Sequence, residues 1–274
     1  MAQRLGEEAS DNLVLAVDAG NTRIVMGAFD GTELLASWSI TAPASLTDDE
    51  AYAAVSSALG FMAQSVGRVS LDVTGSILAS VVPHLSQPLS SALRCVTDRR
   101  PLTVGPGLKT GIKMKYRDPA ELGADRIADI AGALDRYEPP FIVIDLGTTT
   151  NFEVVDADGA FIGGIIAPGM ALGAQSLSEH AAKLPAVDIA APRDVVGSCT
   201  REAIQSGVVL GEVARIDGLV SMIRQGHPAD FRVIATGSNA SSLVPLLQCG
   251  ASRDPDLTLH GLAVLYSLNR KARS

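Results

Sequence analysis

The 274-residue sequence has few cysteines and lacks long apolar runs. Cys95, Cys199 and Cys249 are odd in number and are not spaced as zinc ligands, which excludes a disulfide framework and a structural zinc motif. The apolar runs are shorter than the roughly 20 residues of a transmembrane helix. The acidic N-terminal stretch lacks the apolar centre of a signal peptide. We therefore expect a cytoplasmic protein that does not enter a membrane, with a loose tail at residues 1–11.

Basic residues are also scarce. Lysine and arginine number 22 against 30 aspartates and glutamates, giving a formal net charge of -8. Because nucleic acids are bound by clustered lysine and arginine, this balance argues against a nucleic-acid partner. The sequence has no Walker-type phosphate loop, no GxGxxG after a strand and no GxSxG, so the two commonest nucleotide scaffolds and the serine hydrolase elbow lose support. The four histidines lack metal-ligand spacing, and we assign them no role.

What the sequence does contain is an internal repeat between residues 14–40 and residues 141–166. Each copy reads as an apolar strand, an Asp-x-Gly turn, a second strand, an Asp-Gly turn and a third strand. The pairs Asp30-Gly31 and Asp158-Gly159 predict β-hairpins with type I′ turns, in which both central residues take a positive φ. Each half of the chain is therefore expected to open with a three-stranded meander.

Helices and further strands are predicted after each meander. Thr47 and Glu50 have the spacing of a capping box and predict a helix that extends to about Gln64. Residues 76–82 read as a buried strand. In the second half, apolar residues at helical spacing predict a long helix that starts near Thr200.

Another helix is predicted around Asp125. Residues 118–121 mark its start, and the period of the apolar residues from Ile127 places Asp125 and Asp129 on a different, polar side. Taken alone, Asp125 and Arg126 would read as a solvated helix start with a surface charge pair.

The Asp-x-Gly turns carry the chemistry. In the turn from Asp18 to Thr22, glycine allows a tight reversal that leaves main-chain N–H groups and polar side chains available for phosphate oxygens. The aspartate is suited to a cation or its water shell. Residues Asp145 to Thr148 form a second such turn, and residues 236–239 give a third loop suited to an adenosine or phosphate contact. Two aspartate-bearing loops, one from each half on either side of a nucleotide's phosphates, are the pattern of actin and sugar-kinase ATPases.

These elements predict an α/β fold. We expect two duplicated ribonuclease H-like domains of the actin-like ATPase type, with mixed sheets and an interdomain cleft. The preferred boundary is the Glu-Pro-Pro segment, which gives domains at residues 1–138 and 139–274.

A series of motifs resembles type III pantothenate kinases, in the same order and over nearly the whole chain. The substrate-side signature is matched by residues 107–112, Tyr116, residues 118–119 and residues 123–126, and the first and second phosphate motifs by residues 18–22 and 145–148. Further matches lie at residues 163–169, 184–185, 197–200, 205–207 and 257–269.

This resemblance implies ATP-dependent phosphorylation of the primary hydroxyl of pantothenate, the first step toward coenzyme A. Asp125 would be the catalytic base, and Asp145 would bind a monovalent cation, K⁺ or NH₄⁺, with Mg²⁺ accompanying the nucleotide. The implied pantothenate contacts are Tyr116, Gly123, Ala124, Asp125, Arg126 and Thr200. The implied ATP contacts are Asp18, Ala19, Gly20, Asn21, Thr22, Arg23, Ile24, Val25 and Thr148. The resemblance also implies a homodimer.

Two departures keep other readings open. Thr149, Asn151 and Glu153 stand where the family usually has Ala, Thr and Asp, and Ser238 replaces a glycine, which puts a Cβ near the expected nucleotide. One alternative is a catalytically weak relative that acts as a regulatory accessory protein. Another is the same fold acting on a different hydroxylated substrate, such as a sugar, or hydrolysing a phosphate chain. The motifs retain all four of the charged residues Asp18, Asp125, Arg126 and Asp145, which favours the kinase.

Overall fold

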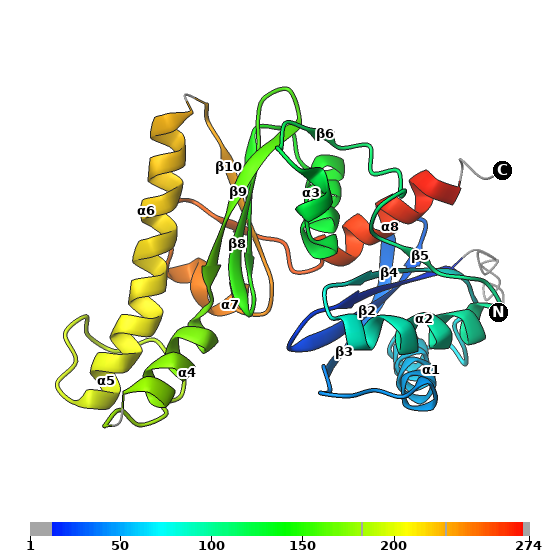
Figure 1. Cartoon of the computed structure of the whole chain (residues 1–274), viewed down its shortest axis with the longest axis horizontal. Coiled ribbons are helices and arrows are strands. Elements are labelled where there is room, and N and C mark those ends of the chain that lie inside the picture. The colour runs from blue at the N-terminus through cyan, green and yellow to red at the C-terminus, as the bar shows by residue number, and fades with distance from the viewer. Residues whose placement is uncertain (1–12, 182, 228, 271–274) are drawn as a thin grey trace, which may run out of the picture. The chain divides into compact units, whose positions relative to one another are not determined.

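The computed structural model describes residues 13–181, 183–227 and 229–270 (Figure 1). Its contacts divide the chain into two compact units, the first formed by residues 1–111, 120–135 and 258–274 and the second by residues 112–119 and 136–257. The C-terminal helix therefore groups with the first unit. The domain boundary after residue 138 concerns the repeat and stays a prediction, and the loose tail expected at residues 1–11 lies outside the described residues.

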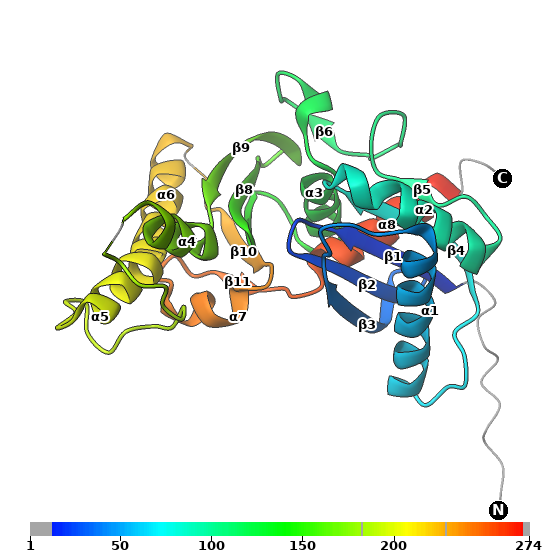
Figure 2. The ribbon, with the colours of Figure 1, turned by 60° about the horizontal axis from the view of Figure 1, so that its bottom comes forward.

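The first unit is built on a five-stranded sheet in the order β3-β2-β1-β4-β5. Its strands are β1 (Leu13–Ala19), β2 (Arg23–Asp30), β3 (Glu33–Thr41), β4 (Val73–Ser80) and β5 (Leu102–Thr103). The first three form the predicted antiparallel meander, and β4 and β5 continue the sheet in parallel. Helices α1 (Asp48–Ser65) and α2 (Pro83–Thr97) bury their apolar residues against one face of this sheet (Figure 2). The capping box of α1 is confirmed, with Thr47 Oγ1 accepting from the Glu50 amide at 3.3 Å.

Helix α8 (Leu257–Arg270) covers the other face of that sheet, where glycines leave room for it (Figure 2). A Cβ on Gly27 would lie 3.0 Å from Leu259 Cδ1, and one on Gly75 would collide with the Tyr266 hydroxyl. A Cβ on Gly261 would collide with the carbonyl oxygen of Ala128 in helix α3 (Ala124–Arg136). The backbone of α8 therefore approaches α3 more closely than a larger residue would permit.

The second unit repeats the plan on a six-stranded sheet in the order β11-β10-β7-β8-β9-β6. Its strands are β6 (Lys113–Met114), β7 (Phe141–Leu146), β8 (Thr149–Val155), β9 (Ala160–Pro168), β10 (Arg232–Thr236) and β11 (Ser252–Arg253). Again three strands form an antiparallel meander, and β10 and β11 extend it in parallel from β7. The prediction of an α/β protein with two mixed sheets is confirmed.

The helices of the second unit are α4 (Met170–His180), α5 (Thr200–Gln205), α6 (Gly211–Gly226) and α7 (Ala240–Leu243), with a short 3-10 turn at Val244–Leu246. Residues of α4, α6 and α7 contribute to a core on one face of the sheet of this unit. A π-helical turn at Ser206–Leu210 joins α5 to α6, so the long helix predicted from Thr200 is confirmed with one irregularity. Among the described residues, no helix has the length and apolar character that crossing a membrane requires.

The Asp-Gly hairpins are confirmed, but the type I′ turns are wrong. Gly31 and Gly159 have φ values of 60° and 71°, whereas the only described non-glycine residue with positive φ is Asp98. Asp30 is still the last residue of β2. In the second hairpin the Asp156 carboxylate accepts from the amides two and four residues later, at 3.0 and 2.9 Å, and this side-chain bonding shapes the turn instead.

One prediction about α3 is corrected, and another is refined. Residues 118–121 mark a 3-10 turn at Pro119–Glu121, and the helix begins only at Ala124. Asp129 lies on the predicted polar side, but it is 1% exposed, and its Oδ1 accepts from Thr258 Oγ1 of α8 at 2.6 Å. The helical spacing that separates Asp129 from the apolar residues was predicted correctly. Helix α8 covers that side of α3 and supplies a hydroxyl in place of water.

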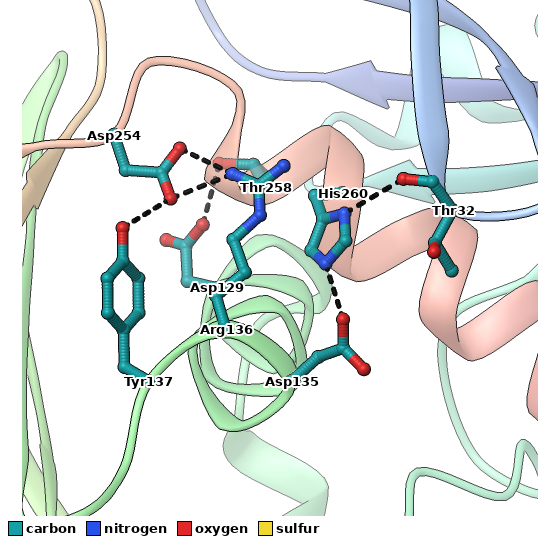
Figure 3. A network of polar contacts seen from close by, with 8 residues as sticks. All are labelled: Thr32, Asp129, Asp135, Arg136, Tyr137, Asp254, Thr258 and His260. Atoms are coloured by element: carbon teal, nitrogen blue, oxygen red, sulfur yellow. Dashed lines mark hydrogen bonds and ion pairs between the residues drawn. The ribbon is translucent and has the colours of Figure 1, made fainter.

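Figure 3 shows the polar contacts around the ends of α3 and α8. In the first unit, His260 on α8 lies between the Asp135 carboxylate at 2.8 Å and the Thr32 carbonyl at 3.2 Å. In the second unit, Arg136 and Tyr137 both donate to Asp254, which is buried. Burial, followed by the hydrogen bond to Asp254, raises the pKa of Tyr137 to about 12, so this hydroxyl remains a donor at neutral pH.

Candidate active site

The first phosphate turn joins β1 to β2. Asp18 pairs with Val25 across the hairpin, and the Gly20 amide donates to the Arg23 carbonyl at 2.9 Å. Residues 21–23 are exposed and can meet a ligand. Ala19 and Ile24 have their side chains in the core, so these predicted ATP contacts have only backbone groups to offer.

Asp18 lies on the face of the sheet that α8 covers. Alternate β1 residues from Leu13 to Ala19 belong to the core with α1 and α2, so Asp18 points to the opposite face. The carbonyl of Ala19 accepts from the Val81 amide at 3.2 Å, directly after β4. A Cβ on Gly123 would lie 3.8 Å from Val81 Cγ1. The first unit therefore brings the phosphate turn and the residue just before α3 to the same neighbour, Val81.

Asp125 occupies the first turn of α3, where the helix dipole favours a negative charge. Its Oδ1 accepts from the Arg126 amide at 2.8 Å. The same oxygen fills the space beside Gly123, because a Cβ there would lie 2.5 Å from it. Ala124 and Arg126 are buried, with Arg126 6% exposed, which is incompatible with a solvated helix start. The carboxylate is thus set at the helix start in a fixed orientation and is partly exposed.

The second phosphate turn joins β7 to β8 and is bonded to the third loop. The Gly147 amide donates to the Thr149 carbonyl at 3.0 Å, and Asn239 donates through its backbone to the Leu146 carbonyl at 2.9 Å. The Asn239 side chain donates to the Gly147 carbonyl at 3.3 Å. Gly237, with φ of 89°, leaves no room for a Cβ beside Asp145 Oδ1. The second unit therefore brings residues 145–148 and 237–239 together, as a shared ligand contact requires.

The surroundings of Asp145 fit a hard cation. Asp145 pairs with Asn151 across the β7–β8 ladder, so both side chains project from the same face of the sheet. Asn151 is 5% exposed, and its Oδ1 has no hydrogen-bond partner among the described residues. A buried carbonyl oxygen that lacks a donor can be satisfied by a cation, and carboxylate and amide oxygens are ligands that such cations prefer. No group of three or more His, Cys, Asp or Glu side chains in the described ranges could hold a metal by itself.

The remaining predicted substrate contacts lie in the second unit. The Tyr116 ring packs against Phe161 with 5.2 Å between centroids, and the preceding residue bonds to the Phe161 backbone at 2.8 Å. Thr200 is exposed as the first residue of α5. The start of α5 is ordered by Glu202, whose carboxylate accepts from the Ser198 amide and hydroxyl at 2.8 and 2.7 Å.

Sequence reasoning missed a buried polar group beside the second turn. Glu212 on α6 is 4% exposed and accepts from Thr150 Oγ1 at 2.5 Å. It also pairs with Arg215, which donates to the Pro168 carbonyl at 2.6 Å. In the sequence, Glu212 and Arg215 have the i,i+3 spacing of an ordinary surface ion pair. Only the many apolar residues next to them in the sequence could have indicated that the pair is buried.

Comparison with known proteins identifies the family. Residues 14–222 match the family model of type III pantothenate kinases. The chain belongs to the type III pantothenate kinase family. Type III pantothenate kinases from Moorella thermoacetica and Exiguobacterium sibiricum are 36% and 38% identical to it, over 94% of this chain and 100% of theirs. The similarity to these kinases therefore extends along their full lengths.

Solved structures support the fold of this kinase. It is similar to a Campylobacter jejuni protein described as a Baf family transcriptional activator, with a TM-score of 0.59 and 18% identity over 94% of this chain and 99% of the other. An activator of 2-hydroxyisocaproyl-CoA dehydratase from Clostridium difficile, solved with bound ADPNP, gives a TM-score of 0.53 and 12% identity over 95% and 96%. At these identities the likeness concerns the fold alone, and it confirms the predicted actin-like fold.

Proposed function

We propose that this protein transfers the γ-phosphoryl group of ATP to the primary hydroxyl of pantothenate, forming 4′-phosphopantothenate in the first step of coenzyme A biosynthesis. The observation that carries the proposal is the full-length similarity to type III pantothenate kinases. Two phosphate turns of the expected form and a fixed helix-start carboxylate support it. The accessory-protein alternative is not favoured, because the relatives are kinases along their whole length.

Phosphoryl transfer needs mainly positioning and charge neutralisation, so one carboxylate suffices to handle the hydroxyl proton. Asp125 is proposed to accept that proton, and the bond to the Arg126 amide orients its carboxylate. Gly123, Ala124 and Arg126 around it, with Tyr116 and Thr200, are proposed to contact pantothenate. Residues 18–25 and Thr148 are proposed to contact ATP.

Cations are proposed to neutralise the phosphate charge, with Mg²⁺ entering with ATP and a monovalent cation held by Asp145 and Asn151. The cytoplasm and a homodimer are proposed as the setting. Several apolar side chains of the second unit are exposed and would be available to a partner subunit; they are Ile166, Leu172, Leu177, Ile189, Val195, Val196 and Met222.

The proposed reaction predicts pantothenate-dependent release of ADP by the purified protein in Mg²⁺ and K⁺. Coupled ADP detection with and without pantothenate measures it, and mass spectrometry identifies the phosphorylated product. A glucose series under the same conditions tests the sugar-kinase alternative. Absence of pantothenate-dependent release in both K⁺ and NH₄⁺ buffers would instead support the accessory protein.

Exchange of K⁺ for Na⁺ is expected to lower the rate, because the oxygen ligands of Asp145 and Asn151 would have to contract around a smaller ion. We expect Asn151→Leu to lower the rate about tenfold in K⁺ and to make it nearly indifferent to the cation, since one oxygen ligand is lost. Steady-state rates in K⁺, NH₄⁺ and Na⁺ at constant ionic strength measure this. An Asn151→Leu enzyme with an unchanged cation preference would count against the assignment.

A further inference from the structure

The second phosphate turn is held from outside by one pair of side chains on α6. Glu212 reaches the hydroxyl of Thr150 at the start of β8, and its partner Arg215 reaches the carbonyl of Pro168 at the end of β9. Both contacts lie next to the turn. Thr150 pairs with Leu146 on one side of it, and Pro168 pairs with Thr149 on the other.

The turn itself depends on those two strand ends. The Gly147 amide donates to the Thr149 carbonyl, and the Gly169 amide donates to the Thr148 carbonyl, both at 3.0 Å. A Cβ on Gly169 would lie 2.5 Å from the Gly147 carbonyl oxygen, so residues 147–148 pack tightly against residue 169. A shift of either strand end would therefore change the positions of the Thr148 N–H and hydroxyl groups.

The π-helical turn at Ser206–Leu210 directs Glu212 to this place. A π turn adds one residue to a helical turn, which rotates the following helix by about 100° relative to a continuous α-helix. Glu212 is the second residue after it and is buried, and a buried carboxylate is tolerated only when paired and hydrogen-bonded. Arg215 and Thr150 together meet that requirement.

We propose that Glu212 and Arg215 are positioning residues for the second phosphate turn, holding the ends of β8 and β9 so that Thr148 meets the nucleotide phosphates. The role in nucleotide binding rests on the proposed function. The role in ordering the turn does not, because it concerns hydrogen bonds within the unliganded second unit.

Hydrogen exchange of the unliganded protein tests the ordering directly. In Glu212→Ala, the amides of Gly147 and Gly169 are expected to exchange about tenfold faster, because a charge-assisted hydrogen bond no longer restrains local opening. The Glu212→Gln side chain can still accept from Thr150, so its exchange rates at these amides are expected to fall between those of the wild type and those of Glu212→Ala. In kinetic assays Glu212→Ala should raise the KM for ATP about tenfold and leave the KM for pantothenate unchanged, since only one substrate meets this turn.

The matched control is Asp217→Asn on the same helix. The Asp217 carboxylate accepts from the amides of residues 248 and 249 at 3.0 and 2.9 Å, away from the turn. This control should lower the melting temperature without changing exchange at Gly147 and Gly169. If Glu212→Ala is too unstable to purify, Glu212→Gln and Arg215→Lys provide the same comparison.

The outcomes separate the two ideas. If the wild-type protein does not phosphorylate pantothenate, the proposed function fails while the exchange result still decides the ordering role. Unchanged exchange at both glycines in Glu212→Ala would overturn the positioning role. So would an increase equal to that in Asp217→Asn, because the effect would then be general destabilisation.

Discussion

Asp125→Asn is expected to lower the kcat for pantothenate phosphorylation about 10²- to 10⁴-fold, the usual contribution of a general base. An amide cannot take the hydroxyl proton, but its oxygen can still accept from the Arg126 amide, so the helix start should survive. The KM for ATP and the melting temperature should therefore stay close to those of the wild type. Steady-state kinetics together with thermal unfolding measure both parts.

Asp135→Asn is the matched control, because it makes the same chemical change near the other end of α3. Its oxygen can still bond to His260, so we expect its kcat to remain within about threefold of the wild type, as for substitutions away from the reacting groups. A second variant, Gly123→Ala, keeps the carboxylate but displaces it, since the new Cβ would lie 2.5 Å from Asp125 Oδ1. If Asp125→Asn retained most of the wild-type kcat, Asp125 would not be the base.

The repeat made the sheets predictable. Two copies of strand, Asp-x-Gly turn, strand and Asp-Gly turn gave both meanders, because alternation and turn residues act over a few neighbouring positions. The capping box at Thr47 was predictable for the same reason. The turn types were not, since Asp156 reshapes the second hairpin through a side-chain bond that competes with the backbone turn.

The site was predictable only as a set of residues. Motif order proposed Asp18, Asp125 and Asp145 as site residues, and these roles stay predictions, but burial depends on neighbours that are distant in the sequence. Asp129 is buried because α8, more than a hundred residues later, covers it and supplies Thr258. Glu212 is buried because a π turn redirects it toward β8. The spacing of apolar residues along each helix predicts neither the burial of Asp129 nor that of Glu212.

The position of Asp125 depends on the contact of α3 with α8. Thr258 bonds to Asp129, one helical turn after Asp125, and Gly261 lies against the Ala128 carbonyl. His260 bonds to Asp135 further along α3 (Figure 3). These contacts are spread along α3, so a change in α8 is expected to move the whole helix, including the carboxylate at its start.

Gly261→Ala is therefore expected to impair stability and rate together. Its Cβ would collide with backbone atoms of α3, which cannot rotate away as a side chain could, so we expect a loss of about 2–3 kcal/mol in the free energy of unfolding. Displacement of Asp125, the proposed base, by a fraction of an ångström should also lower kcat about tenfold or more, because catalysis is sensitive to shifts of that size. Denaturant unfolding and steady-state kinetics measure the two effects.

Gly60→Ala on α1 is the control that isolates this collision. Beyond the adjacent residues and the nearby backbone of α1 itself, no atom lies within 4 Å of a Cβ built on Gly60, so the substitution should only improve helix propensity, adding about 0.5–1 kcal/mol of stability with unchanged kcat. Both changes replace a helical glycine by alanine, so any difference between them arises from what the new methyl group meets. If Gly261→Ala matched Gly60→Ala in stability and kcat, the contact between α8 and the backbone of α3 would not determine the position of α3. The orientation of Asp125 would then depend on the first turn of α3 alone.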